Sequence, residues 1–338
     1  MHNHAARIAF VGAGNHSTEC LYPNIAHIPE FDLVAVCDLD EAKAARAAKV
    51  YGAPEYFTDV EIMLDKVQPD GVCVCGMPDV HYLVGLQVLQ HNTPVWMEKP
   101  PAWTALEAAE LAAAASTQGT FGMVGFMKRF APANMVAKDY IENGDFGGLN
   151  SFSMIHGSGP YDDIRRMLLF NAIHMLDMGR FFAGNVAEVF AFRSPEGSKV
   201  QALTISMRFA NGVVGQLNMN SSVSWVDCFE QAYFSGDGAA ILVDASREVH
   251  LMAADRQFAH PEGTRLCGWG SRYYVSGNLS GWAAGGHYTR GYHGELEHFA
   301  KAVLGQVAPM ATLEDGLRAM QLIEAIMESI ETGQPVGL

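Results

Sequence analysis

The chain lacks most features that mark membrane, nucleic-acid-binding or disulfide-rich proteins. Basic residues are scarce: 22 Lys and Arg stand against 37 Asp and Glu in 338 residues, a formal net charge of -15. Because nucleic acid is bound through a basic face, this balance argues against a nucleic-acid partner. It also supplies no polybasic signal for a membrane surface. The apolar runs are all too short to span a bilayer, so we expect no membrane partner.

Cysteine is also sparse, with 6 residues and no Cys-x-x-Cys pair. Reduced, mostly buried thiols are therefore expected, and no metal site is expected. The first four residues contain no apolar signal core, which favours a cytoplasmic location. The sequence has no internal repeat and no low-complexity tract.

The length of 338 residues is large for a single hydrophobic core, and the sequence pattern changes near residue 125. Before that point short apolar strands alternate with helices, which indicates a parallel sheet covered on both faces. After it come a helix at 171–183 and many strands, two of them joined by the hairpin signal Asn211-Gly212. From 247 to 291 the pattern is irregular. We predict an α/β protein with domains 1–124 and 125–338.

The first forty residues carry the most informative motif. An apolar run at 8–11 leads directly into Gly12-Ala13-Gly14-Asn15-His16, and a second apolar run at 31–37 ends at Asp38. Strand, glycine turn, helix, strand and acid follow in the order of a dinucleotide-binding βαβ unit. This pattern predicts an N-terminal Rossmann domain.

Each residue type in this motif has a physical reason. Gly12 permits a tight turn, and Gly14 lets a pyrophosphate approach the backbone at the positive end of the next helix. Asp38 accepts hydrogen bonds from ribose hydroxyls and repels a 2′-phosphate, so NAD is favoured over NADP. Ser17 stands where the third glycine of the fingerprint is usual. The predicted cofactor-binding residues here are Gly12, Gly14, Asn15, His16 and Asp38.

Further motifs are spread over the chain: Pro78-x-x-His81, Glu98-Lys99-Pro100, Ala172-Ile173-His174 with Asp177, and Gly291-Tyr292-x-x-Glu295. With the glycine turn, they resemble the Gfo/Idh/MocA oxidoreductases over nearly the whole chain. The resemblance implies a Rossmann domain plus a C-terminal α+β domain with a large, mostly antiparallel open sheet. Such sheets commonly stack between subunits, so a homodimer or homotetramer is expected.

The resemblance also implies hydride transfer between a nicotinamide and a carbinol carbon of a sugar, sugar derivative or cyclitol. This chemistry needs a base for the hydroxyl proton and a donor near the developing oxyanion. Lys99 lies just past a strand end and, by the resemblance, touches substrate and nicotinamide ribose. The bond between Lys99 and Pro100 is often cis in the family. His174 is the acid/base candidate, because an imidazole titrates near neutral pH.

The remaining site residues also come from the resemblance. Pro78, His81 and Glu98 are further predicted cofactor-binding residues. Pro78 and His81 belong to the loop on the nicotinamide side, and Glu98 is also expected to hold its own loop by accepting backbone hydrogen bonds. Arg129 is equally suited to a structural ion pair. The predicted substrate-binding residues are Lys128, Tyr161, Arg165 and Asn171.

The chain departs from the family at Phe170, where many members carry an acid four residues before the histidine. Three readings therefore stay open: an NAD-dependent dehydrogenase, an NAD-using glycosidase acting through transient oxidation, and a catalytically retired regulator that binds NAD and sugar. Retention of Lys99 and His174 favours the first. The nearby acids that would replace the missing one are Asp162, Asp163 and Asp177.

Overall fold

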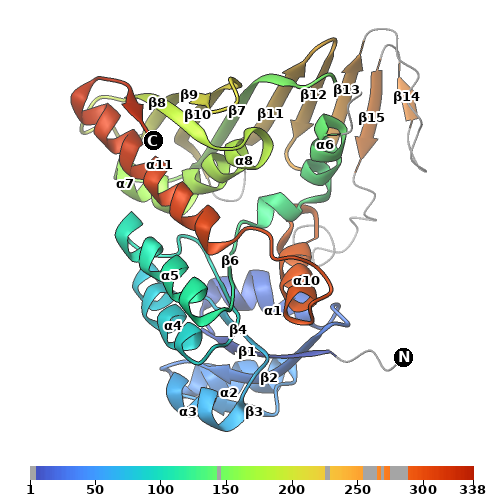
Figure 1. Ribbon diagram of the computed structural model, residues 1–338, viewed down its shortest axis with the longest axis vertical. Helices are drawn as coiled ribbons and strands as arrows, with labels where there is room; N and C mark the ends of the chain where they lie inside the picture. The colour runs from blue at the N-terminus through green and yellow to red at the C-terminus, as the bar shows by residue number, and fades with distance from the viewer. Residues whose placement is uncertain (1–4, 143–145, 225–228, 254–264, 268–269, 275–287) are drawn as a thin grey trace. The chain divides into compact units, whose positions relative to one another are not determined.

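The computed structural model describes residues 5–142, 146–224, 229–253, 265–267, 270–274 and 288–338 (Figure 1). The chain divides into two compact units, 1–127 with 281–320 and 128–280 with 321–338. The segment 281–320 thus groups with the first unit, whereas the sequence analysis placed all of 125–338 in one domain. The assignment of cofactor and substrate binding to the two domains stays a prediction.

The first unit contains a parallel sheet of six strands in the order β3-β2-β1-β4-β5-β6. Between β1 and β4 the strand order reverses, and ligands of open α/β sheets bind at the carboxyl ends of the strands at such a point. This confirms the Rossmann prediction. The strands are β1 Ala6–Val11, β2 Phe31–Cys37, β3 Glu55–Phe57, β4 Gly71–Val74, β5 Val95–Met97 and β6 Gly122–Val124.

Helices cover this sheet, and their ends follow local sequence signals. Asp40 caps α2 by accepting from the backbone N–H groups of Ala42 and Lys43, and Thr104 with Glu107 forms a capping box on α5. Helix α4 packs on α5 and on β4 and β5, and α10 packs on β1 and α1. The helices are η1 Ser17–Leu21 running into α1 Tyr22–Ile25, α2 Glu41–Tyr51, α3 Val60–Val67, α4 Pro78–Gln90, α5 Ala105–Gln118 and α10 Tyr292–Val303.

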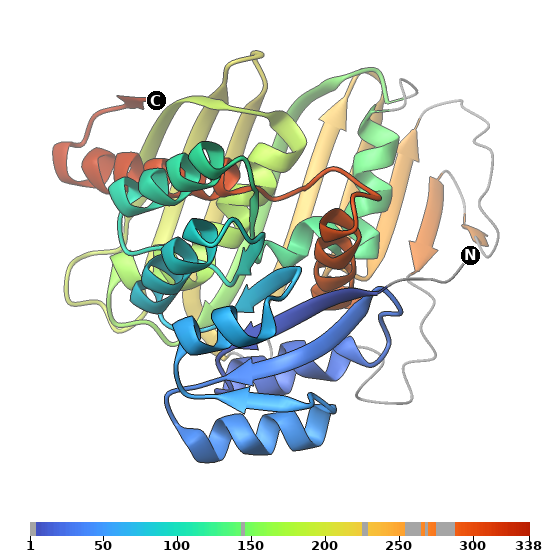
Figure 2. The same ribbon diagram turned by 60° about the horizontal axis from the view of Figure 1, so that its bottom comes forward.

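The second unit contains one broad sheet of ten strands, with helices on one face (Figure 2). Among the strand pairs described, β7 with β10 is parallel and the other pairs are antiparallel. This confirms the expected mostly antiparallel sheet. The strands are β7 Leu149–Gly159, β8 Val186–Arg193, β9 Ala202–Phe209, β10 Val214–Ser224, β11 Phe229–Gly236, β12 Ala239–Asp244, β13 Glu248–Ala253, β14 Arg265–Cys267, β15 Gly270–Tyr274 and β16 Val336–Gly337.

Two sequence expectations for this sheet have different outcomes. The hairpin at Asn211-Gly212 is confirmed: it joins β9 to β10, with Gly212 at a φ of +90°. The irregular stretch at 247–291 is wrong in part, because β13, β14 and β15 lie there. Of these, β14 and β15 have only 3 and 5 residues, whereas the six residues of β13 include the polar–apolar alternation Glu248-Val249-His250-Leu251, a strand signal that the prediction overlooked.

The remaining helices belong to the second unit, except that Met127 of η2 and residues 313–320 of α11 group with the first unit. Helix α8 packs on β7, and α6 packs on β12 and β13. Among the described helices, none combines the length and apolar character needed to cross a membrane. The helices are η2 Met127–Phe130, α6 Pro132–Glu142, α7 Ile164–Met167, η3 Leu168–Ala172, α8 Ile173–Ala183 and α11 Leu313–Thr332.

Candidate active site

The glycine turn after β1 has the geometry that a bound dinucleotide requires. Gly12 has a φ of +103°, and a Cβ there would lie 2.0 Å from the Cys75 carbonyl oxygen, so only glycine fits. At Gly14 a Cβ would meet nothing within 4 Å, so the space beside its backbone is open. The chain is helical from Asn15, and His16, the residue that precedes η1, makes no side-chain cap to it. The first N–H groups of this helical segment are therefore available to an anion, and the turn fits a pyrophosphate.

Asp38 ties the end of β2 to this turn. Its Oδ2 accepts from the Ala13 N–H at 2.7 Å and its Oδ1 from the Asp40 N–H at 2.9 Å. Each carboxylate oxygen keeps a second lone pair for a ribose hydroxyl. The departure at Ser17 is accommodated, since this side chain is buried and its Oγ donates to the Gly14 carbonyl at 2.9 Å.

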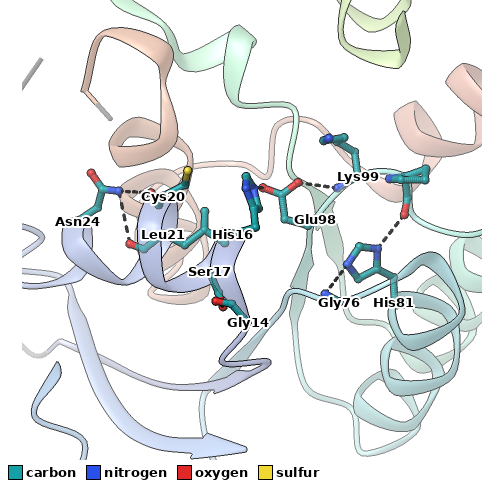
Figure 3. A network of polar contacts seen from close by, with 11 residues as sticks. Gly14, His16, Ser17, Cys20, Leu21, Asn24, Gly76, His81, Glu98 and Lys99 are labelled. Atoms are coloured by element: carbon teal, nitrogen blue, oxygen red, sulfur yellow. Dashed lines mark hydrogen bonds and ion pairs between the residues drawn. The ribbon is translucent and has the colours of Figure 1, made fainter. Parts of the chain in front are cut away.

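His81 joins two of the loops that border the site. The Gly76 N–H donates to its Nε2 at 2.9 Å, and its Nδ1 lies 2.8 Å from the Pro100 carbonyl, which can only accept (Figure 3). Burial lowers the pKa of His81 to about 4, so the ring is neutral. Both ring nitrogens are engaged within the protein. His81, close to Pro78 at the start of α4, therefore positions the loop rather than offering a polar group to a ligand.

The Glu98-Lys99-Pro100 segment follows β5 and is held by the buried Glu98 carboxylate. Its Oε2 accepts from the Lys99 N–H at 2.9 Å, and its Oε1 lies 3.1 Å from His16 Nε2 (Figure 3). The expectation that Glu98 stabilises its loop is confirmed, and the Lys99–Pro100 bond is cis. The backbone of Lys99 is thus fixed at the carboxyl edge of the sheet.

His16 and Glu98 form an ion pair at neutral pH. Burial acts to lower the pKa of His16, but the Glu98 carboxylate outweighs it and raises that pKa to about 10. For Glu98, burial acts to raise the pKa, and the attraction of His16 and of Lys99 holds it below its usual value. The His16 side chain is 42% exposed and Glu98 only 4%, so the glutamate is the buried member of the pair.

Glu295 on α10 is a buried acid to which the sequence analysis gave no role. Its residue is fully buried, and among the described residues neither carboxyl oxygen has a hydrogen-bond partner. Burial and then the negative charge of Glu98 raise the pKa of Glu295 well above its usual value. Folding therefore favours the protonated, neutral form of Glu295.

In the second unit, Arg129 and Asp177 form a buried bidentate ion pair. Arg129 Nε donates to Oδ2 of Asp177 at 2.8 Å, and Nη2 donates to Oδ1 at 2.6 Å. Asp163 caps α7 by accepting from the Arg166 N–H at 2.8 Å. Asp177 and Asp163 thus have structural partners, and Asp162 is exposed. The structural interpretation of Arg129 and Asp177 is confirmed.

The other predicted substrate-side residues lie on α7, η3 and α8 or just before them. Asn171 is buried one turn before His174, which is also buried, and the Asn171 Nδ2 donates to the Ser158 carbonyl at 3.3 Å. Tyr161 is buried, and burial raises the pKa of its hydroxyl. Arg165 is half-buried. Lys99 lies in the first unit and His174 in the second, so their joining in one active site stays a prediction.

Lys128 belongs to a cluster on the helix-covered face of the large sheet. Its Nζ donates to Glu230 Oε2, His156 Nδ1 lies 3.2 Å from the same oxygen, and Ser246 Oγ donates to Oε1 at 2.7 Å. His156 on β7 and Glu230 on β11 are directly opposite in the sheet. Neither residue was predicted from the sequence as part of a site. The sequence feature that could have indicated them is a charged or titratable residue at a strand position where the alternation predicts a buried side chain.

The fold and the open glycine turn define a dinucleotide-binding protein. A family model described as the oxidoreductase family, NAD-binding Rossmann fold, matches residues 6–126. The model for the C-terminal alpha/beta domain of the same family matches residues 166–338. The chain belongs to the Gfo/Idh/MocA oxidoreductase family, and its first domain is an NAD-binding Rossmann domain.

Two proteins of named activity and one solved structure are similar to this chain. The chain is 30% identical to the D-glucoside 3-dehydrogenase of Escherichia coli over 196 residues, 53% of this chain and 54% of the relative. It is 26% identical to the myo-inositol 2-dehydrogenase of Thermotoga maritima over 98% of each chain. A solved dehydrogenase from Chromobacterium violaceum superposes with a TM-score of 0.87 at 22% identity, covering 98% of this chain and 97% of that one.

Proposed function

We propose that this protein is an NAD-dependent dehydrogenase that moves a hydride between the nicotinamide and a carbinol carbon of a sugar, sugar derivative or cyclitol. The observation that carries the proposal is the Lys99 loop, which Glu98 holds at the carboxyl edge of the parallel sheet. The open space at Gly14 and the carboxylate of Asp38 support NAD as the nucleotide. The names of the two relatives support a ring CH–OH group as the reacting group.

When bound, NAD supplies the hydride acceptor. The residues of the chain do the rest. The turn at Gly12 and Gly14 with the N–H groups after Asn15 holds the pyrophosphate, and Asp38 orients the ribose. His81 and Glu98 keep the two flanking loops in place.

Lys99 and His174 divide the chemistry of the substrate hydroxyl. The Lys99 ammonium donates to the oxygen and stabilises the negative charge that develops there. His174 accepts the hydroxyl proton, because the imidazole side chain is a general base of the kind that titrates between pH 5 and 8 when unperturbed. Phe170 leaves His174 without the family's acid one turn earlier. The proposed substrate-contacting residues are Lys128, Tyr161, Arg165 and Asn171.

The test is NADH fluorescence during titration of the protein with NAD and a panel of sugars, cyclitols and glycosides. We expect NADH to accumulate with a sugar or cyclitol. Lys99→Met should abolish turnover and leave NAD binding nearly intact, whereas the exposed Lys43→Met serves as the control and should keep full activity. Unchanged turnover in Lys99→Met would remove the mechanism.

Two other outcomes would favour the alternative readings. Cleavage of a glycoside without net NADH would favour an NAD-using glycosidase. Binding of NAD and a sugar with no redox change for any compound would favour a regulator. The glycosidase and regulator alternatives are retained because Phe170 stands where many family members have an acid.

We also propose that a second copy of this chain covers the open face of the large sheet. Ile155, Phe192 and Tyr233 lie on strands of this sheet with side chains 37%, 65% and 42% exposed. Apolar side chains gathered on one sheet face are typical of a self-association surface. Light scattering should give a dimer or tetramer mass, and Phe192→Glu should lower it. A monomeric wild type would overturn this proposal.

A further inference from the structure

The cluster around Glu230 fixes the orientation of Lys128. The side chains of Lys128 and Glu230 are only 10% and 11% exposed. Glu230 Oε2 accepts from Lys128 and lies 3.2 Å from His156 Nδ1, and Oε1 accepts from Ser246 at 2.7 Å. With both oxygens engaged, the carboxylate is held in one orientation. The ammonium that it binds is held with it.

Glu230 is ionised in this cluster. Burial acts to raise the pKa of Glu230, but Lys128 and His156 outweigh burial and hold that pKa well below its usual value. Within this ion pair, the positive charge of Lys128 and the negative charge of Glu230 cancel. Lys128 therefore brings N–H groups to this face of the sheet without a net positive charge.

The neighbouring cation is cancelled in the same way. Arg129 follows Lys128 directly and is bound bidentately by Asp177, with side chains 6% and 1% exposed. Both basic residues after β6 thus have an acidic partner within the second unit. An ammonium has three N–H groups, and Glu230 takes one, so Lys128 keeps donors for hydroxyl oxygens. A carboxylate approaching Lys128 would meet Glu230 beside it.

We propose that Glu230 is a positioning residue that makes this site select neutral polyhydroxylated compounds over their carboxylate analogues, the sugar acids. Glu230 acts through Lys128, by cancelling its charge and aiming its N–H groups. The inference rests on the proposed function in so far as Lys128 contacts the substrate. It goes beyond that function by naming the charge class of the substrate and the residue that sets it.

The test is calorimetric binding of three matched pairs to the full-length protein loaded with NADH, at about pH 8, where the carboxylic acids are ionised. The pairs are glucose with glucuronate, galactose with galacturonate, and methyl glucoside with methyl glucuronide. We expect the wild type to prefer the neutral member of a pair. Glu230→Gln should raise the affinity for the acid relative to the neutral compound by about tenfold, the effect of removing one close carboxylate repulsion.

A second variant gives the opposite sign. Lys128→Gln leaves Glu230 uncompensated, so binding of the acid relative to the neutral compound should weaken further. Glu230→Asp keeps the negative charge that Glu230→Gln removes, so this variant should prefer the neutral compound over the acid as the wild type does. Glu188→Gln is the matched control, because Glu188 forms an exposed ion pair with Arg208 in the same sheet, 3.8 Å apart. It should leave the ratio unchanged.

The proposal is overturned if Glu230→Gln and Lys128→Gln change the ratio of acid affinity to neutral-compound affinity in the same direction. It is also overturned if each variant weakens binding of the acid and of the neutral compound equally, as a purely structural role requires. It is also overturned if the wild type prefers the acid or binds no member of the pairs. The proposed function has a separate readout, NADH formation with a neutral substrate. NADH formation together with an unchanged ratio in Glu230→Gln would remove this inference alone.

Discussion

Glu295→Gln tests whether the buried acid on α10 is neutral in the folded protein. Glutamine has nearly the same size and leaves the same two polar atoms without partners, so packing and desolvation change little. The groups around Glu295 that carry or can carry charge are Glu98, Lys99, Cys73 and Tyr292. What the substitution removes is the ability to ionise.

The sign and size follow from proton linkage. Because burial raises the pKa of Glu295 in the folded state, the folded protein binds this proton more tightly than the unfolded chain does. Stability is therefore lost as the pH rises above the unfolded value of about 4.5, by about 1.4 kcal/mol for each pH unit over which Glu295 stays protonated. Between pH 5.5 and 7.0 the gain in stability of Glu295→Gln over wild type should grow by about 2 kcal/mol.

Urea unfolding of both proteins at these two pH values measures the difference. The control is Glu297→Gln on the same helix, whose carboxylate pairs with Lys301 at 2.8 Å and is 35% exposed. It should show no comparable growth with pH. If the advantage of Glu295→Gln were constant or shrank as the pH rises, Glu295 would be an ionised group with a stabilising partner, and the reasoning would fail.

Three further predictions concern ion pairs and the nucleotide. Asp177→Ala removes the buried carboxylate that binds Arg129 bidentately and should lower the free energy of unfolding by about 3–5 kcal/mol in urea titrations; a loss under 1 kcal/mol, the size expected of an exposed pair, would contradict the buried geometry. His16→Gln should lower the melting temperature at pH 7 and have no effect above pH 10, because the raised pKa of His16 makes its stabilisation full below pH 6.5 and lost as the pH passes about 10. Asp38→Ser should raise the binding of NADP relative to NAD by about tenfold, since a carboxylate near a 2′-phosphate costs about 1–2 kcal/mol even at the dielectric constant of water; an unchanged ratio would show that Asp38 does not face the ribose.

Features set by a short stretch of backbone were predictable from the sequence. Gly12 must adopt a left-handed conformation against Cys75, and Asn211-Gly212 must close a two-strand turn, so residue type and local geometry correspond directly. The parallel sheet follows from apolar strands that are buried on both faces. Glu98 was predictable as a loop-holding acid because its partner is the next residue, Lys99.

Features that join distant segments were not predictable. Lys128 and Glu230 are 102 residues apart, and nothing near either residue in the sequence points to the other. The two ring nitrogens of His81 contact the Gly76 N–H and the Pro100 carbonyl, and the sequence around His81 does not point to either partner. Such pairings depend on which strands become neighbours in the sheet.

The sequence by itself determined the class of protein, the NAD-binding turn and the positions of Lys99 and His174, because these depend on motifs of a few residues whose backbone needs are local. The tertiary structure alone decided the charge state of the side chains around them. Burial favours the neutral form of Glu295, the neighbouring Glu98 favours the cationic form of His16, and Glu230 cancels the charge of Lys128. Charge in a protein depends on burial and on the nearest charges, and both arise only when the chain is folded.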